Sequence, residues 1–279
     1  MRSPARRPSP SRALRSGQES AGRPPVGTPV AGAFFDRDPL DVAAALLGLV
    51  LCHRVRGRWL MASLVETEAY YLEDKASHAS LGFTEKRRAL FMPAGTVYMY
   101  YARGGDSFNV SVRGAGNAVL FKAGLPLLPE HLPREPEGER PRRPWSAREA
   151  AAMLDRMARL NPLPSGAPRP VQRLCGGQTL LCKALHLRVP AWDGRPLPSP
   201  GLMLVDVGYR PSRIVRTRRL GIPAHRDPHP LYRFVDLDRA QAASRHPLPR
   251  EAREGVDYAW VTPPEGAGSR KRPGRLAVP

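Results

Sequence analysis

Cysteine, acidic residues and long apolar runs are all scarce in this sequence. The three cysteines, Cys52, Cys175 and Cys182, form no C-x-x-C pair, which argues against a disulfide framework or a zinc ribbon and favours a reducing compartment. No apolar run reaches membrane-spanning length, and the N-terminus lacks the apolar segment of a secretory signal. We therefore expect neither a membrane protein nor a secreted one.

Two histidines raise the question of a metal site. His225 and His229 have the spacing of metal ligands on one helix face, but the prolines at 228 and 230 oppose that helix. We therefore expect no metal and no cofactor.

The shortage of acids leaves a large positive charge. Lys and Arg number 44 against 25 Asp and Glu, which gives a formal net charge of +19. Nucleic acid is the natural partner for such a chain, because each phosphate neutralised by Lys or Arg releases a condensed counterion. A genome biased toward arginine codons would produce the same surplus, so charge alone suggests a polyanionic partner without establishing one.

The two ends of the chain differ in composition from its middle. Residues 1–32 and 244–279 consist largely of Arg, Pro, Ser, Gly and Glu, with few large apolar side chains. Segments of this kind bury too little apolar surface to offset chain entropy, so we predict two disordered basic tails. The remaining residues, 33–243, are of suitable length for one domain.

Local patterns within that domain predict both helices and strands. Asp38 is a good N-cap before a helix at 39–47, and a Ser146–Glu149 capping box precedes a helix at 147–160. A third helix should follow the glycines at 176–177, over 179–185. Strands are predicted at 49–54, 60–70, 96–101, 107–112, 118–122, 202–209 and 212–218. The predicted fold class is a mixed α/β (α+β) domain around a curved, mostly antiparallel sheet with a protruding hairpin at 103–106.

The strand at 60–70 carries the residues of greatest chemical interest. A period of two places Glu66, Glu68 and Tyr70 on one face, at the end of an apolar stripe. Carboxylates in that position would lie at the mouth of a concave site, and His78 in the following loop could join it. The alternative is a strand that emerges into solvent with two ordinary glutamates and an exposed loop histidine.

Several motifs together resemble those of the alkyladenine (3-methyladenine) DNA glycosylase family. They begin with VETEAY at 65–70, Asp74, ASH at 76–78, GTVYMY at 95–100 and Asn109. They continue with AVLFKA at 118–123, LCGG at 174–177, LCKAL at 181–185, RLGI at 219–222 and LYRF at 231–234. The resemblance runs from about Phe34 to Asp236, with the motifs in the family's order.

The resemblance implies a mechanism for damaged DNA. In this family the target nucleotide rotates out of the duplex into a pocket. Tyr70, His78 and Tyr100 match the positions that sandwich the flipped base, and Glu68 matches the general base that activates water. Lys122 matches a position where relatives commonly carry arginine, so its role should be similar but weaker.

Further properties are implied by the same resemblance. Asn109 matches the residue that rejects guanine by crowding its exocyclic amino group. The expected reaction is hydrolysis of the N-glycosidic bond of alkylated or deaminated purines in double-stranded DNA, without a cofactor, which initiates base excision repair. We expect a monomer that acts in the cytoplasm on the nucleoid if the source is bacterial, or in the nucleus if it is eukaryotic.

One segment departs from the family pattern. Residues 100–109 read YYARGGDSFN, one residue shorter than usual, with no tyrosine at the hairpin tip to fill the gap left by a flipped base. Tyr101 or Arg103 could occupy that gap. The turn at Gly176 and Gly177 could present a helix N-terminus to a DNA phosphate, or it could be only a turn.

Three other functions remain open at this stage. The chain could be a module of the same fold that binds lesions or abasic sites with little turnover. It could be a bifunctional lyase that uses Lys122 as a nucleophile, which would require a deprotonated amine. It could also be a basic RNA-binding protein whose affinity resides in the tails.

Overall fold

A computed structural model of the chain describes residues 24–133, 145–226 and 230–261. Ten strands among these residues form one sheet, and every pairing between named strands is antiparallel. The strands are β1 (Thr28–Pro29), β2 (Val50–Val55), β3 (Arg58–Tyr70), β4 (Val97–Ala102), β5 (Gly105–Ser111), β6 (Ala118–Pro126), β7 (Leu202–Asp206), β8 (Ile214–Thr217), β9 (Arg233–Asp236) and β10 (Tyr258–Val261). The predicted mixed fold with a mostly antiparallel sheet is confirmed.

The long strand β3 organises the sheet. Along one edge it pairs first with β2 through residues 58–63 and then with β9 through residues 66–68, while β6 pairs along the other edge. The β3–β6 register shifts on both sides of Glu66. Such bulges bend a strand and redirect its side chains. The predicted alternation over 60–70 is therefore interrupted at these shifts, but Glu66 and Glu68 pair in continuous register with β9 and lie on one face, as predicted.

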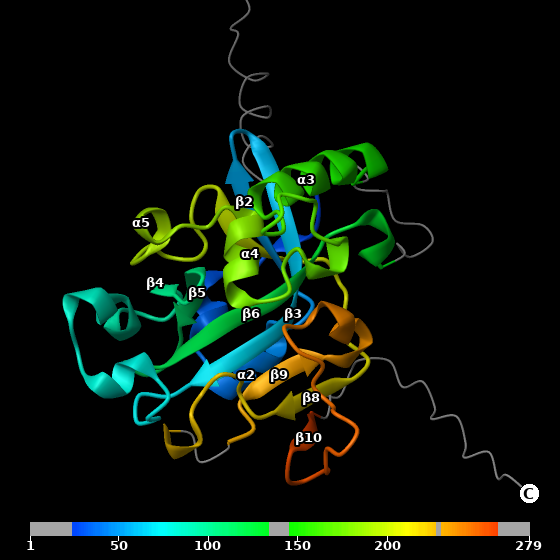
Figure 1. Cartoon of the computed structure of the whole chain (residues 1–279). Coiled ribbons are helices and arrows are strands. Elements are labelled where there is room, and N and C mark those ends of the chain that lie inside the picture. Colours follow the sequence, from blue (N-terminus) through cyan, green and yellow to red (C-terminus); the bar gives the residue numbers. More distant parts are fainter. Residues whose placement is uncertain (1–23, 134–144, 227–229, 262–279) are drawn as a thin grey trace, which may run out of the picture.

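Four α-helices of the described region pack around the sheet: α2 (Pro39–Ala45), α3 (Ala147–Leu160), α4 (Gln178–Leu185) and α5 (Val189–Trp192). Figure 1 shows α4 across the front of the sheet and α2 behind it. The predicted caps are present, since Asp38 accepts a hydrogen bond from the Leu40 amide and Ser146 and Glu149 form a capping box. None of the described helices has both the length and the apolar character needed to cross a bilayer.

Short 3-10 helices complete the described region: η1 (Gly32–Phe35), η2 (His78–Leu81), η3 (Glu85–Phe91), η4 (Pro129–His131), η5 (Val171–Arg173), η6 (Ala224–Arg226) and η7 (Leu237–Ala242). The apolar core fills both faces of the sheet, with Phe108, Phe121 and Met61 among its fully buried side chains. Two rings in it, Phe108 and Phe121, lie 5.2 Å apart between centroids. This core fixes β3, β5 and β6 relative to one another and so positions the side chains at their ends.

The folded region extends past both boundaries predicted from composition. Strand β1 lies within 1–32 and pairs with β7, and strand β10 lies within 244–279 and pairs with β8. Ser244 donates both its amide and its hydroxyl to Glu66. These segments are ordered by an available sheet edge and a buried acceptor elsewhere in the chain, which composition does not reveal. Strand β9 also went unpredicted.

Candidate active site

Glu68 lies near the end of β3 with its side chain fully buried. The Tyr70 hydroxyl donates to Oε2 at 2.6 Å, and the Lys122 ammonium lies 3.2 Å from Oε1. The Leu220 amide points at the same Oε1 from 3.5 Å. Lys122 comes from the adjacent strand β6, where it is the extra residue between Ala123 and Phe121, which pair with Glu66 and Thr67. Because its side chain is fully buried, Glu68 is not the solvent-exposed glutamate of the alternative interpretation.

A pocket opens beside this carboxylate. Its lining is mainly aromatic and small: Tyr70, Ala76, Ser77, His78, Leu90, Tyr98, Tyr100, Asn109, Ala118 and Leu120. It therefore brings together four residues that the sequence predicted for substrate binding, namely Tyr70, His78, Tyr100 and Asn109. They come from β3, η2, β4 and β5, so only the folded chain makes them neighbours.

The rings in the pocket do not stand as three separate layers. The centroids of His78 and Tyr100 lie 4.4 Å apart in an edge-to-face contact, and His78 Nδ1 is 2.9 Å from the Tyr98 hydroxyl. These residues therefore form one joint wall. A planar ligand between aromatic rings would stack with this wall on one side and Tyr70 on the other, since no ring-sized gap separates His78 from Tyr100.

Burial shifts the pKa of several rings in this pocket, those of Tyr70 and His78 among them. Burial and the neighbouring Glu68 raise the pKa of Tyr70, so the phenol keeps its proton and donates to the carboxylate. Burial lowers the pKa of His78, and Arg87 and Arg226 lower it further. A neutral imidazole at neutral pH suits stacking and the hydrogen bond to Tyr98.

Asn109 is placed by the hairpin register. It lies opposite Tyr98 in the β4–β5 ladder, and its side-chain amide donates to the Tyr98 carbonyl at 3.2 Å. The side chain is buried and lines the pocket. This hydrogen bond holds the amide in one orientation, as a residue that discriminates by crowding requires.

Arg219 is a residue of the site to which the sequence analysis assigned no role. Its fully buried guanidinium lies 4.5 Å from the centroid of the Tyr70 ring and 5.3 Å from that of Tyr232. It also donates to the Ala69 carbonyl at 2.9 Å and pairs with Asp74. Arg219 thus connects β3, the following loop and β9 behind Tyr70. The RLGI motif could have drawn attention to it, but burial of the guanidinium is not visible in a sequence.

The hairpin tip is tighter than predicted. Ala102 pairs with Gly105, so the turn consists of Arg103 and Gly104 alone, and Gly104 has the positive φ of +96° that favours glycine. Tyr101 is 69% exposed and Arg103 is exposed as well. Both side chains are available at the surface, as a residue that fills a gap in DNA must be.

The Gly176–Gly177 turn has a structural explanation. A Cβ on Gly176 would approach the Arg173 guanidinium to within 2.9 Å, and Arg173 donates to the Ala243 carbonyl at 2.7 Å. Gly177 is the N-cap of α4, and nothing lies within 4 Å of a Cβ built there. Gly176 thus makes room for the Arg173 side chain, which ties η5 to the end of η7.

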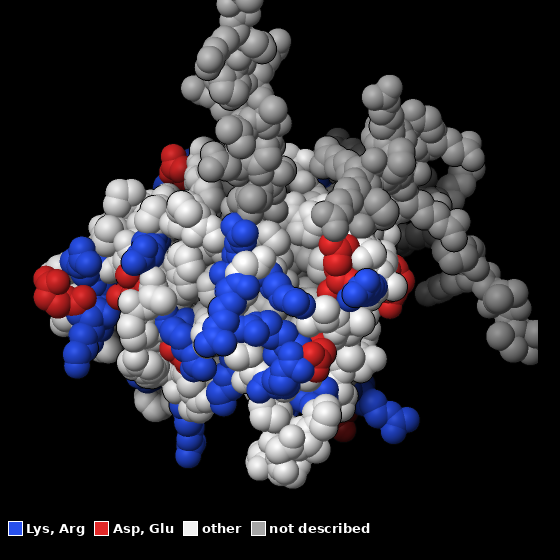
Figure 2. Space-filling view, turned by 90° about the horizontal axis from the view of Figure 1, so that it is seen from above, with Lys and Arg blue, Asp and Glu red and all other residues white. Residues whose placement is uncertain are grey.

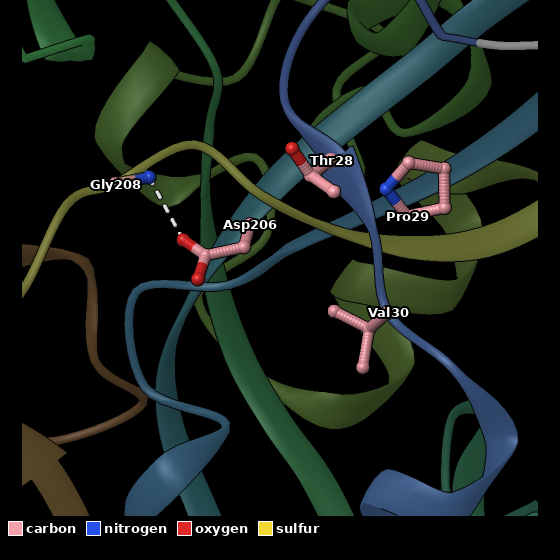
Figure 3. A pocket seen from close by; sticks show the side chains of 5 residues that line it. All are labelled: Thr28, Pro29, Val30, Asp206 and Gly208. Atoms are coloured by element: carbon pink, nitrogen blue, oxygen red, sulfur yellow. Dashed lines mark hydrogen bonds between the residues drawn. The ribbon is translucent and has the colours of Figure 1, made fainter.

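Another hollow of the surface offers less chemistry. Figure 3 shows one between β1 and β7, lined by Thr28, Pro29, Val30, Asp206 and Gly208. Asp206 is its only charged liner, and it already accepts from the Gly208 amide and pairs with Arg210.

Of the two histidines considered as metal ligands, only one lies among the described residues. His225 lies in η6, and His229 lies outside the described residues. In the part of the chain that the structure describes, no three His, Cys, Asp or Glu side chains group as a metal site would require.

Comparison with known proteins gives consistent similarities. The family model described as methylpurine-DNA glycosylase (MPG) matches residues 33–240. A protein of Pseudomonas fluorescens (strain Pf0-1) named "Putative 3-methyladenine DNA glycosylase" is 50% identical over 236 residues, covering 85% of this chain and 94% of its own. A protein of the same name in Pseudomonas aeruginosa (strain UCBPP-PA14) is 51% identical over 234 residues, covering 84% of this chain and 91% of its own. Another in Agrobacterium fabrum (strain C58 / ATCC 33970) is 33% identical over 190 residues, covering 68% of this chain and 80% of its own.

Proposed function

The chain belongs to the methylpurine-DNA glycosylase family, and we propose that it is a DNA glycosylase that hydrolyses the N-glycosidic bond of damaged purines in double-stranded DNA. One observation supports this most strongly: a buried carboxylate, Glu68, held by Lys122 and Tyr70, lies directly beside an aromatic pocket. The bacterial relatives favour action on the nucleoid in a bacterial cytoplasm.

The pocket suits a purine that has left the duplex. Extrusion costs a few kcal/mol and costs least for a poorly paired base, while stacking on aromatic rings returns about 1–3 kcal/mol per base. Tyr70 would form one side of the stack, and the wall of His78 and Tyr100 the other. Purines alkylated on a ring nitrogen carry a positive charge, so the tyrosine faces attract them more strongly than they attract normal bases. Asn109 would crowd the 2-amino group of guanine.

The carboxylate supplies the chemistry. Glu68 removes a proton from a water molecule whose oxygen bonds to the anomeric carbon of the sugar, while the bond from that carbon to the base nitrogen breaks and its electron pair leaves with the base. The negative charge of Glu68 also stabilises the positive charge that develops on the sugar. Lys122 and Tyr70 orient the carboxylate. Because Lys122 is engaged in the ion pair with Glu68, we propose water as the nucleophile and not the lysine.

A single-turnover excision assay tests this function. Duplexes with 3-methyladenine, 1,N6-ethenoadenine or hypoxanthine are incubated with excess enzyme, and the released base is measured for the wild type and for Glu68→Gln. We expect release from at least the alkylated substrates by the wild type and its loss in the variant, with binding retained. Wild-type release by Glu68→Gln would refute the role of this carboxylate.

The hairpin favours a second candidate. Its two-residue tip lacks a tyrosine, and the ammonium of Lys122 pairs with Glu68 at a single point. A protein that extrudes bases inefficiently would bind lesions or abasic sites without turnover. Tight binding of all three substrates with no release of any base would favour this module over the enzyme.

A further inference from the structure

Three arginines from three different elements meet at the C-terminal end of α4. Arg56 lies in the turn between β2 and β3, Arg156 lies on α3, and Arg188 follows α4. A hydrogen-bond contact of 2.7 Å between His53 Nδ1 and the Leu185 carbonyl brings the β2–β3 hairpin against the end of α4.

Helix α3 brings Arg156 to the same place. Asn161 at its end donates to the Leu180 carbonyl of α4, which packs the C-terminal part of α3 against that helix. Arg156 lies in that part of α3, and its charge acts on His186 at the end of α4.

This cluster carries charge that the protein does not neutralise. Arg188 pairs with Asp106 at 3.2 Å, but among the described residues neither Arg56 nor Arg156 has an ion-pair partner, and the Arg156 Nε is buried without a hydrogen bond. His186, between them, has a buried Nδ1 that is also without a partner in the described region. Burial lowers its pKa, and so do Arg188, Arg156 and Arg56, which places all three arginines close to this ring. Figure 2, which looks down on this end of the molecule, shows Lys and Arg gathered in one patch with few acids beside them.

The cluster also borders the β4–β5 hairpin. Asp106, the partner of Arg188, follows the hairpin turn closely in β5, and a Cβ on Gly105 would touch Lys183 of α4 at 3.4 Å. A duplex that meets the hairpin tip can therefore continue over the end of α4 without leaving the protein surface.

We propose that Arg56, Arg156 and Arg188 form a second contact surface for the phosphate backbone of duplex DNA, outside the pocket that receives the damaged base. This inference rests on the proposed function, because it takes DNA as the partner. Phosphates would supply the hydrogen-bond acceptors and the negative charge that the cluster lacks. The contact carries no sequence information and holds the duplex in register beside the hairpin.

The test is the salt dependence of binding by the full chain to an undamaged duplex of about 24 base pairs. The variant combines Arg156→Gln with Arg56→Asn, since the positive φ of Arg56 suits asparagine. Each lost phosphate contact should reduce the slope of log K against log salt by about 0.9, so the double variant should lose about 1.8. Arg56→Asn alone should lose about half of that. The matched control, Arg213→Gln with Arg253→Gln, removes the same charge next to β8 and β10, at the opposite end of the molecule in Figure 1.

The outcomes separate this inference from the proposed function. A reduced slope in the double variant with an unchanged slope in the control supports the surface. Equal slopes in all proteins overturn it, as does a loss of affinity for RNA with none for duplex DNA. Base release from a hypoxanthine or 3-methyladenine duplex is measured in parallel. Release with equal slopes refutes the surface alone, whereas a reduced slope without any release keeps the surface and refutes the glycosylase.

Discussion

Two carboxylates on β3, Glu66 and Glu68, are both fully buried but bind different partners. Glu66 accepts from Arg233 Nε at 2.6 Å, from the Ser244 hydroxyl at 2.7 Å and from the Ser244 amide at 2.6 Å. Glu68 accepts from the Tyr70 hydroxyl and lies beside Lys122, next to the aromatic pocket.

The difference shows that the donors around a buried carboxylate matter more than its burial. Arg233 and Ser244 bind Glu66 at short distances and connect β3 to β9 and to the segment that leads to β10. Lys122 lies farther from Glu68, and the Leu220 amide farther still, so that carboxylate has more freedom to accept from a water molecule. Glu66 is therefore suited to stabilising the fold, and Glu68 to chemistry.

The largest effect should come from Glu68→Gln. An amide cannot accept the proton of water, so single-turnover base release should fall by about 10²–10⁴-fold. The free energy of unfolding should change by no more than about 2 kcal/mol, because Lys122 keeps some contact with solvent. Exposed Glu73→Gln serves as the control and should match the wild type in both measurements. A Glu68→Gln protein whose melting temperature lies far below that of the wild type would show that Glu68, like Glu66, mainly stabilises the fold.

Glu66→Gln should show the reverse pattern. It leaves the Arg233 guanidinium, which is 2% exposed, without its counter-charge, and breaking a buried pair costs about 3–5 kcal/mol. For a domain of this size we expect a fall in melting temperature of about 6–20 °C, measured by calorimetry. Base release per folded molecule should remain near wild type at low temperature. Loss of release in a fully folded variant would show that Glu66 also takes part in the reaction.

Arg219→Lys should weaken the binding of the damaged base in the pocket beside Glu68 and leave the chemical step largely intact. Lysine keeps the positive charge but loses the planar face that packs on Tyr70 and the Nη1 group that donates to both Ala69 and Asp74. The enzyme concentration for half-maximal single-turnover release should rise about tenfold, consistent with a loss of about 1–2 kcal/mol. The maximal rate should change much less. A fall in the maximal rate alone would assign Arg219 to the chemistry and not to the positioning of Tyr70.

The smallest effect should be a pH dependence of stability that arises in the pocket. The folded-state pKa of His78 lies below its unfolded value, so the unfolded chain takes up the proton first as the pH falls. Its contribution is fully present above about pH 6.5 and is lost as the pH falls through the lower, folded pKa. The wild type should therefore lose more stability between neutral and mildly acidic pH than His78→Phe, as measured by urea unfolding. The same loss in both proteins would contradict this. Among the described residues no histidine contacts Glu66, so we expect no comparable histidine-linked pH dependence from the surroundings of Glu66.

Much of the site could be predicted because its residues lie in specific motifs. The VETEAY, ASH and GTVYMY segments led to Glu68, Tyr70, His78 and Tyr100, and the structure places the three rings in one pocket beside the carboxylate. Glu66 does share a face with Glu68, because both pair in continuous register with β9, but its partners Arg233 and Ser244 come from distant segments that a local pattern does not reveal. Arg219 went unassigned because its interest lies in burial and in contacts made 145 or more residues away.

The sequence by itself determined the local events: the helix that Asp38 caps, the capping box at Ser146, and the glycine turn of the β4–β5 hairpin. These depend on hydrogen bonds and backbone angles within a few residues, so the residue types suffice to predict them. Only the tertiary structure decided which glutamate binds a tyrosine of the pocket, where the fold ends and which arginines meet at α4. The physical reason is that bulges, edge pairing and buried charges depend on partners far away in the chain, and no local pattern encodes their distance.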